Sequence, residues 1–171
     1  MTNLINAEWM KLRTTRMFYG LALAALAMVT VSVASAISLA GRPDGAPALD
    51  TSEGLRNVLS AASSGKFIVL ILGILMVAGE FRHNTATSTF LLNPDRKKVI
   101  GAKLATATLV GTGLAVAASA LTLAIALPWL AAKNIDVNLW SGDILEVLLA
   151  AMAATAIYAL VGVGLGCILR N

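Results

Sequence analysis

Few side chains in this sequence could do metal or acid–base chemistry, and the clearest pair lies in one short polar segment. Glu80 and His83 are three residues apart, a spacing that places two metal ligands on one face of a helix. The pair occurs once, however, and His83 is the only histidine of the chain. One histidine in this segment cannot complete a hydrolytic Ser-His-acid set elsewhere. The sequence therefore predicts no catalytic residue and no metal site.

A nucleotide site is not predicted either. Gly65 and Lys66 form the only Gly-Lys pair, but a phosphate-binding loop needs a glycine five residues before Gly65 and a hydroxyl residue after Lys66. Ser60 and Phe67 occupy those positions. Any energy from ATP must therefore come from another polypeptide.

Three glycines near the C-terminal end imitate a dinucleotide fingerprint without the strand that such a motif follows. Gly162 and Gly166 are four residues apart, so they lie on one face of a helix, where small residues let another helix approach closely. We interpret them as helix-packing residues. The neighbouring helix belongs either to the same chain or to a partner.

The elements that carry these residues are apolar runs typical of a membrane protein. The chain has 58% hydrophobic and 13% charged residues and a mean hydropathy of +0.82, whereas soluble domains carry about 25% charged residues. A spanning helix needs roughly 20 apolar residues to cross a hydrocarbon core of about 30 Å. We predict an all-α polytopic bundle forming a single membrane domain over residues 1–171. Its predicted elements are an interfacial helix at 3–16, spans at 17–39, 58–79, 104–130 and 147–169, and an inner loop at 80–103.

Lys66 is the one clear charge inside a predicted span. Intramembrane charges mark functional sites by default, so Lys66 is a candidate for lining a substrate path. The alternative is that its side chain reaches the outer membrane surface, about 10 Å away if the span ends at Gly79. The sequence leaves both interpretations open and favours the second.

The distribution of cations predicts the orientation, because short cytoplasmic loops retain Lys and Arg. With the N-terminus inside, nine cations lie on the inner side and three on the outer side. The inner set is Lys11, Arg13, Arg16, Arg82, Arg96, Lys97, Lys98, Lys103 and Arg170, and the outer set is Arg42, Arg56 and Lys133. We therefore expect both termini to be cytoplasmic, and the net charge of +4 does not require a nucleic-acid partner.

Two shorter segments, the N-terminal helix and the residues before the second span, also have recognisable sequence patterns. Ile5, Trp9 and Leu12 share one face of an N-terminal helix, which suits either the lipid headgroup region or an extension of the first span. This start also imitates a secretory signal, although its apolar run is longer than such signals have. Asp50 and Glu53 are typical of a helix start ahead of the second span.

In the inner loop, Asn84 or Thr85 can cap a short helix that carries Phe90, and Pro94 can start the next long helix. Such a helix would lie across the inner membrane face. Phe90 is the best candidate for an apolar contact with a partner, because aromatic residues fill interface pockets. The alternative is that Phe90 and its neighbours dip into the lipid interface.

These segments together resemble a known family, the membrane subunits of bacterial type-2 ABC exporters. The residues that carry the resemblance are Glu8, Lys11, Leu12 and Arg13, then Gly79, Glu80, Phe81, Arg82, Thr85, Thr89, Pro94, Arg96 and Lys103, and the glycine-rich fourth span ending in Leu169, Arg170 and Asn171. Asn84 stands where the family commonly has glycine, a mild departure because asparagine tolerates left-handed geometry.

The resemblance implies an efflux permease in the bacterial inner membrane, with the inner loop as a coupling helix. A separate cytosolic ABC ATPase would bind ATP and Mg²⁺, and a second permease subunit, identical or different, would complete the transporter in the lipid membrane. The residues expected to couple to the ATPase are Glu80, Arg82, Thr85, Phe90 and Arg96.

The resemblance also has a gap, because the family has six spans and this sequence has four. We interpret the chain as a shortened or partial permease. A small non-transporting four-span protein, such as an immunity or regulatory bundle, is the alternative. An intramembrane enzyme is a distant third, for want of polar groups at depth, and the sequence does not identify a substrate.

Overall fold

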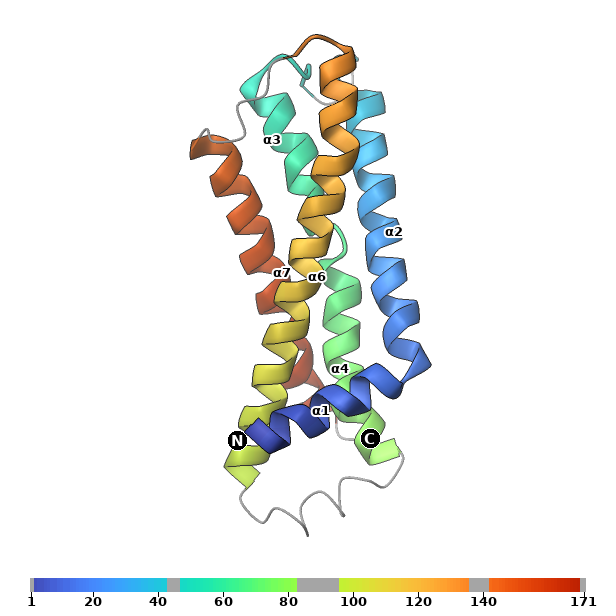
Figure 1. Cartoon of the computed structure of the whole chain (residues 1–171), viewed down its shortest axis with the longest axis vertical. Coiled ribbons are helices and arrows are strands. Elements are labelled where there is room, and N and C mark those ends of the chain that lie inside the picture. The colour runs from blue at the N-terminus through green and yellow to red at the C-terminus, as the bar shows by residue number, and fades with distance from the viewer. Residues whose placement is uncertain (1, 43–46, 83–95, 136–141, 170–171) are drawn as a thin grey trace.

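The computed structural model describes residues 2–42, 47–82, 96–135 and 142–169, and within these ranges every regular element is helical. Four stretches are long and apolar enough to cross a membrane, namely Arg16–Leu39, Ser52–Gly79, Lys97–Ala132 and Ile144–Ile168. They lie alongside one another in an elongated bundle (Figure 1). The predicted all-α fold of a polytopic helical bundle is confirmed.

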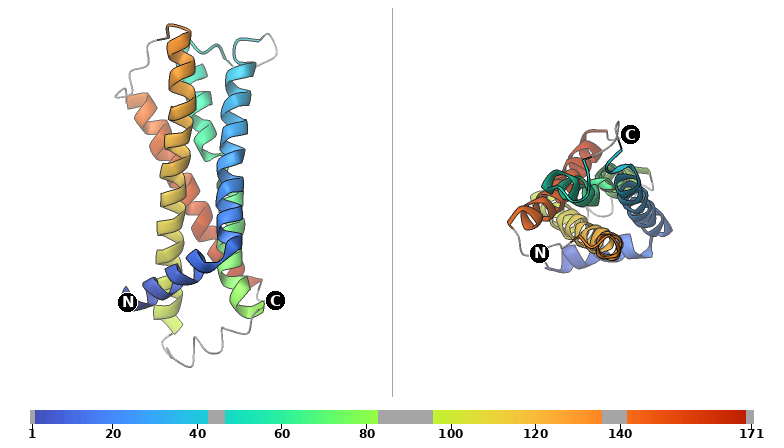
Figure 2. Two further views of the ribbon diagram at one scale, coloured as in Figure 1. Left: turned by 45° about the vertical axis from the view of Figure 1, so that its right-hand side comes forward. Right: turned by 90° about the horizontal axis from the view of Figure 1, so that it is seen from above.

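The first helix crosses one end of this bundle. Helix α1 (Thr2–Thr14) meets α2 (Arg16–Leu39) at a bend, where Thr15 has an extended backbone. The Thr15 hydroxyl donates a hydrogen bond to the Lys11 carbonyl at 2.7 Å, which satisfies one of the free carbonyls at the end of α1. Figure 2 shows α1 lying roughly perpendicular to the long helices, as an interfacial helix would. We call this end of the bundle the α1 end.

The second candidate span is interrupted near its middle. It consists of α3 (Ser52–Ser60), a 3₁₀ turn (Ala61–Ser63) and α4 (Lys66–Arg82). Helix α3 is capped by Thr51, whose hydroxyl accepts a hydrogen bond from the Gly54 amide at 3.1 Å, so the cap is one residue later than Asp50. The predicted span at 58–79 had no interruption and began later.

The remaining helices, α6 (Arg96–Ala132) and α7 (Gly142–Ile168), are the longest in the described chain. Helix α6 ends in a paired C-terminal motif in which Asn134 takes a left-handed conformation with φ 55°. The Asn134 and Ile135 amides then donate to the carbonyls of Ala131 and Leu130. Ile135 also packs on the apolar core that contains Leu130, which fixes the direction of the chain after α6.

The apolar core is divided along the bundle. Toward the far end, α2, α3 and α6 enclose a cluster formed by Val29, Val33, Ile37, Leu49, Val58, Ala118, Ala126 and Leu130. Toward the α1 end, α4, α6 and α7 enclose a second cluster formed by Leu72, Met76, Val77, Ala107, Val110 and Val163. The interrupted span changes its packing partners between the two, and its break lies where they meet.

Candidate functional site

Helix α1 is joined to α6 by a buried ion pair. Lys103 Nζ donates to Glu8 Oε2 at 2.7 Å, and these two side chains are only 6% and 7% exposed. The other carboxylate oxygen, Oε1, accepts from Lys11 Nζ at 2.8 Å. The Glu8 carboxylate therefore has a donor on each oxygen. Such complete pairing is what a buried charge requires.

Apolar contacts support the same joint. Leu12 of α1 and Phe18 of α2 pack on the cluster that contains Met76 and Val110. Helix α1 is therefore fixed both by charge and by packing. It packs mainly against α6, near the cluster at the α1 end.

The coupling residues predicted from the sequence fall at this end, but most of their surroundings lie outside the described residues. Glu80 and Arg82 are in the last turn of α4, and Arg96 is the first residue of α6. Both helix ends lie at the α1 end (Figure 1). Thr85 and Phe90 belong to the segment 83–95, which is outside the described residues. Lys103 is seven residues after Arg96, so the ion pair lies about 10 Å along α6 from the start of that helix.

The second notable site is the break in the middle of the bundle. The Ser60 and Ser63 hydroxyls donate to the carbonyls of Asn57 and Ser60, an alternative to regular helix pairing that serine commonly offers. Gly65 follows, and a Cβ there would lie 2.9 Å from the Ala25 carbonyl oxygen. Only glycine lets the break approach α2 this closely.

Lys66 is the first residue after the break. Its ammonium lies 5.9 Å from the centre of the Phe67 ring and 5.6 Å from the centre of the Tyr158 ring, within the range of cation–π attraction. The two rings meet edge to face with their centres 5.3 Å apart. Lys66 lies near the middle of the Ser52–Gly79 span, about 20 Å from either end. The helical stretch on the α3 side of Lys66 is thus longer than in the predicted span at 58–79, because it starts at Ser52.

The glycines predicted to pack helices lie between α4 and α7. A Cβ on Gly166 would lie 2.8 Å from the Ile74 carbonyl oxygen, and one on Gly162 would collide with the Leu70 carbonyl oxygen. Gly73 of α4 faces the same contact, so both backbones approach each other through small residues. On another face of α7, a Cβ added to Gly164 would meet no atom within 4 Å. The packing partner in the structure is therefore a helix of the same chain.

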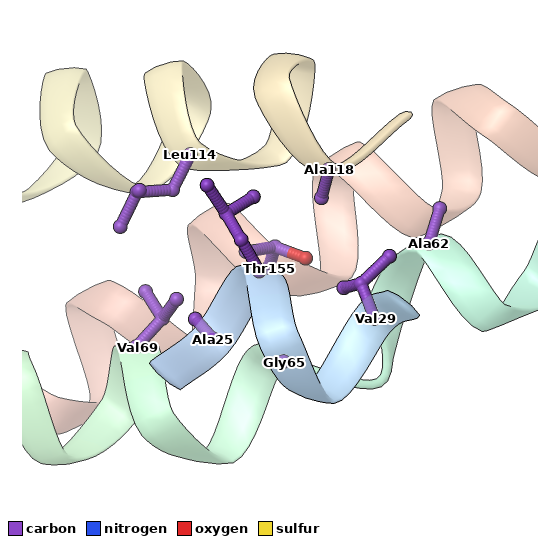
Figure 3. Close-up of a pocket in the computed structure, with 9 residues that line it drawn as sticks. Ala25, Val29, Ala62, Gly65, Val69, Leu114, Ala118 and Thr155 are labelled. Carbon is purple, nitrogen blue, oxygen red and sulfur yellow. The ribbon is translucent and has the colours of Figure 1, made fainter. Parts of the chain in front are cut away.

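The centre of the bundle encloses very little space. A cavity of about 10 Å³ lies beside the break, lined mainly by Ala25, Val29, Gly65, Leu114 and Ala118 (Figure 3). That volume fits about one water molecule, whereas ligand pockets usually have several hundred Å³. Thr155 also lines it, but its hydroxyl donates to the Ala151 carbonyl of its own helix. This cavity has no room for a transported molecule.

The described residues contain no group of three or more His, Cys, Asp or Glu side chains placed to hold a metal ion. Three buried hydroxyls, those of Ser64, Ser119 and Thr122, have no hydrogen-bond partner within the same ranges. Three features were missed from the sequence. Glu8 and Lys103 are 95 residues apart, so nothing local indicates their contact. Tyr158 occurs in an apolar run in which Thr155 is the nearest polar side chain. The third is the break in the second span, although the serines and glycine at 60–65 are a recognisable helix-breaking pattern.

A bundle of four apolar helices with a helix across one end defines a multi-pass membrane protein. Residues 4–169 match the family described as ABC-2 family transporter protein. Because this match covers nearly all of the sequence, the chain belongs to that family and is a transporter membrane subunit. No curated protein and no solved structure matches the chain significantly.

Proposed function

We propose that this chain is the permease subunit of an ATP-driven exporter and that a separate cytosolic ATPase docks on the segment 83–95. The observation that supports this most is the buried contact between Glu8 and Lys103. It connects the interfacial helix to α6, the helix that leads directly out of the proposed docking segment. A push on that segment would therefore move α1 and α6 together rather than bend them separately.

The proposed pathway lies between two permease subunits, identical or different. The small central cavity supports this arrangement. It has a volume of about 10 Å³, enough for about one water molecule, so a single bundle has no internal pathway for a larger substrate. ATP and Mg²⁺ would be held by the ATPase. The permease would contribute the wall of the pathway and the docking segment, and it would lie in the bacterial inner membrane with both termini in the cytoplasm. Membership of a transporter family favours this proposal over a non-transporting bundle.

The proposed contact is tested by recovering the ATPase with a tagged chain from the native membrane. Phe90→Ala should reduce recovery of a Walker-motif ATPase at least tenfold, because truncating an interface aromatic typically removes about 2 kcal/mol or more. Trp129→Ala is the matched control, since Trp129 is a half-exposed aromatic at the far end of α6. Recovery would be measured by quantitative mass spectrometry of detergent-solubilised complexes. Equal recovery with both variants would contradict the docking assignment.

A further inference from the structure

The strongest unexplained feature is a cation in the middle of an apolar bundle with no anion of the described residues beside it. Among these residues Lys66 forms no ion pair, and every Asp and Glu of the sequence lies outside the central part of the four candidate spans. Lys66 is also the first residue of α4, where free backbone amides add positive potential. No carboxylate within the described ranges neutralises that charge.

The Lys66 side chain stays near the middle of the bundle and does not extend toward either end. Its ammonium lies over the rings of Phe67, the next residue, and Tyr158 of α7. A bilayer centred on the Ser52–Gly79 span puts Lys66 about 15 Å from either surface. This exceeds the reach of a lysine side chain, so the rings and not the headgroups surround the charge.

The surroundings of Lys66 open toward the outside of the bundle. Phe67 is 60% exposed, and the exposed apolar residues Ile71 and Val161 follow within about one helical turn on α4 and α7. The buried hydroxyl of Ser64, two residues before Lys66, has no partner among the described residues. A charged group that meets an apolar surface of this kind fits a ligand with a charged head and an apolar tail.

We propose that Lys66, with the rings of Phe67 and Tyr158, binds the carboxylate of a single-chain anionic amphiphile whose tail lies along Ile71 and Val161. A headgroup at this depth is away from both membrane surfaces, as the headgroup of a molecule in transit would be. This inference names a substrate class for the proposed exporter, and it rests on that function only for calling the ligand a substrate.

The test measures binding of radiolabelled oleate to the purified chain in phosphatidylcholine nanodiscs at about pH 9, where carboxylates are ionised. Oleyl alcohol and oleylamine have the same tail with a neutral and a cationic head, and serve as competitors. Oleate should bind at least tenfold more tightly than either, because a charge-assisted contact at an apolar site distinguishes the heads strongly. Lys66→Arg should retain this preference.

Lys66→Gln should weaken oleate binding about tenfold and abolish the preference over oleyl alcohol, whereas Lys133→Gln, at an exposed lysine of the far end, should leave both unchanged. Equal oleate binding by wild type and Lys66→Gln would overturn the proposal. Displacement of oleate by phosphatidylglycerol in the nanodisc would also overturn it, because the anion would then be a membrane lipid. Elution as a single species in size-exclusion chromatography shows that each variant is folded.

This assay contains no ATP and no ATPase. Its failure would remove the Lys66 site and leave the docking proposal intact. Conversely, unchanged ATPase recovery by Phe90→Ala would remove the docking assignment and leave oleate binding unaffected.

Discussion

Two lysines of this chain lie among apolar helices, and their charges have opposite kinds of partner. Lys103, at the α1 end, is paired with the Glu8 carboxylate at 2.7 Å and is almost completely buried. Lys66, at the central break, has two aromatic rings and no carboxylate among the described residues. The first charge is satisfied within the chain and so serves the fold. The charge of Lys66 is only partly stabilised by the two rings, so it remains available to an anionic ligand.

The largest effect is expected where the pairing is complete. Lys103→Met leaves the buried Glu8 carboxylate with only Lys11, which is 45% exposed, and should destabilise the folded chain by about 3–5 kcal/mol. Glu8→Leu combined with Lys103→Met removes both charges and should recover most of that loss. The measurement is thermal unfolding in mild detergent, with Lys133→Met as the matched exposed control. A double variant as unstable as the single one would contradict a role based on pairing.

An intermediate effect is expected between the two regions, where α4 and α7 touch. Gly162→Ala places a methyl group against the Leu70 carbonyl and should destabilise the bundle by about 1–3 kcal/mol. Gly164→Ala adds the same methyl group to the same helix where no atom lies within 4 Å, and it should be neutral or slightly stabilising. Equal unfolding temperatures for the two variants would mean that the α4–α7 backbones are not in close contact.

The sequence predicted the spans of this bundle but not the central break or the ion pair at the α1 end. Four spans and an all-helical fold follow from the length of the apolar runs, because burying a backbone in lipid requires helices of that length. The break at 61–65 was not predicted, since its small residues keep the mean hydropathy high while serine and glycine weaken the helix. The Glu8–Lys103 pair joins residues 95 positions apart and depends on which helices meet at the α1 end. The coupling roles of Thr85 and Phe90 stay predictions, as do the cytoplasmic location of the termini and the direction of transport.

The smallest effect, and one of opposite sign, is expected at Lys66. Removing a charge from the middle of a span stabilises the inserted helix by about 2.5–3.5 kcal/mol on insertion scales, and losing the cation–π contacts costs about 2 kcal/mol. Lys66→Met should therefore be about 0.5–1.5 kcal/mol more stable than the wild type. Lys66→Met should instead weaken the binding of oleate.

The most direct test of this contrast is to compare Lys66→Met and Lys103→Met in one preparation, measuring both thermal unfolding and oleate binding. We predict that Lys103→Met unfolds at a clearly lower temperature than the wild type, while Lys66→Met unfolds at the wild-type temperature or slightly above it and loses the preference for oleate over oleyl alcohol. Comparable destabilisation by both substitutions, with oleate binding unchanged in Lys66→Met, would show that the two lysines have the same structural role and would contradict the account.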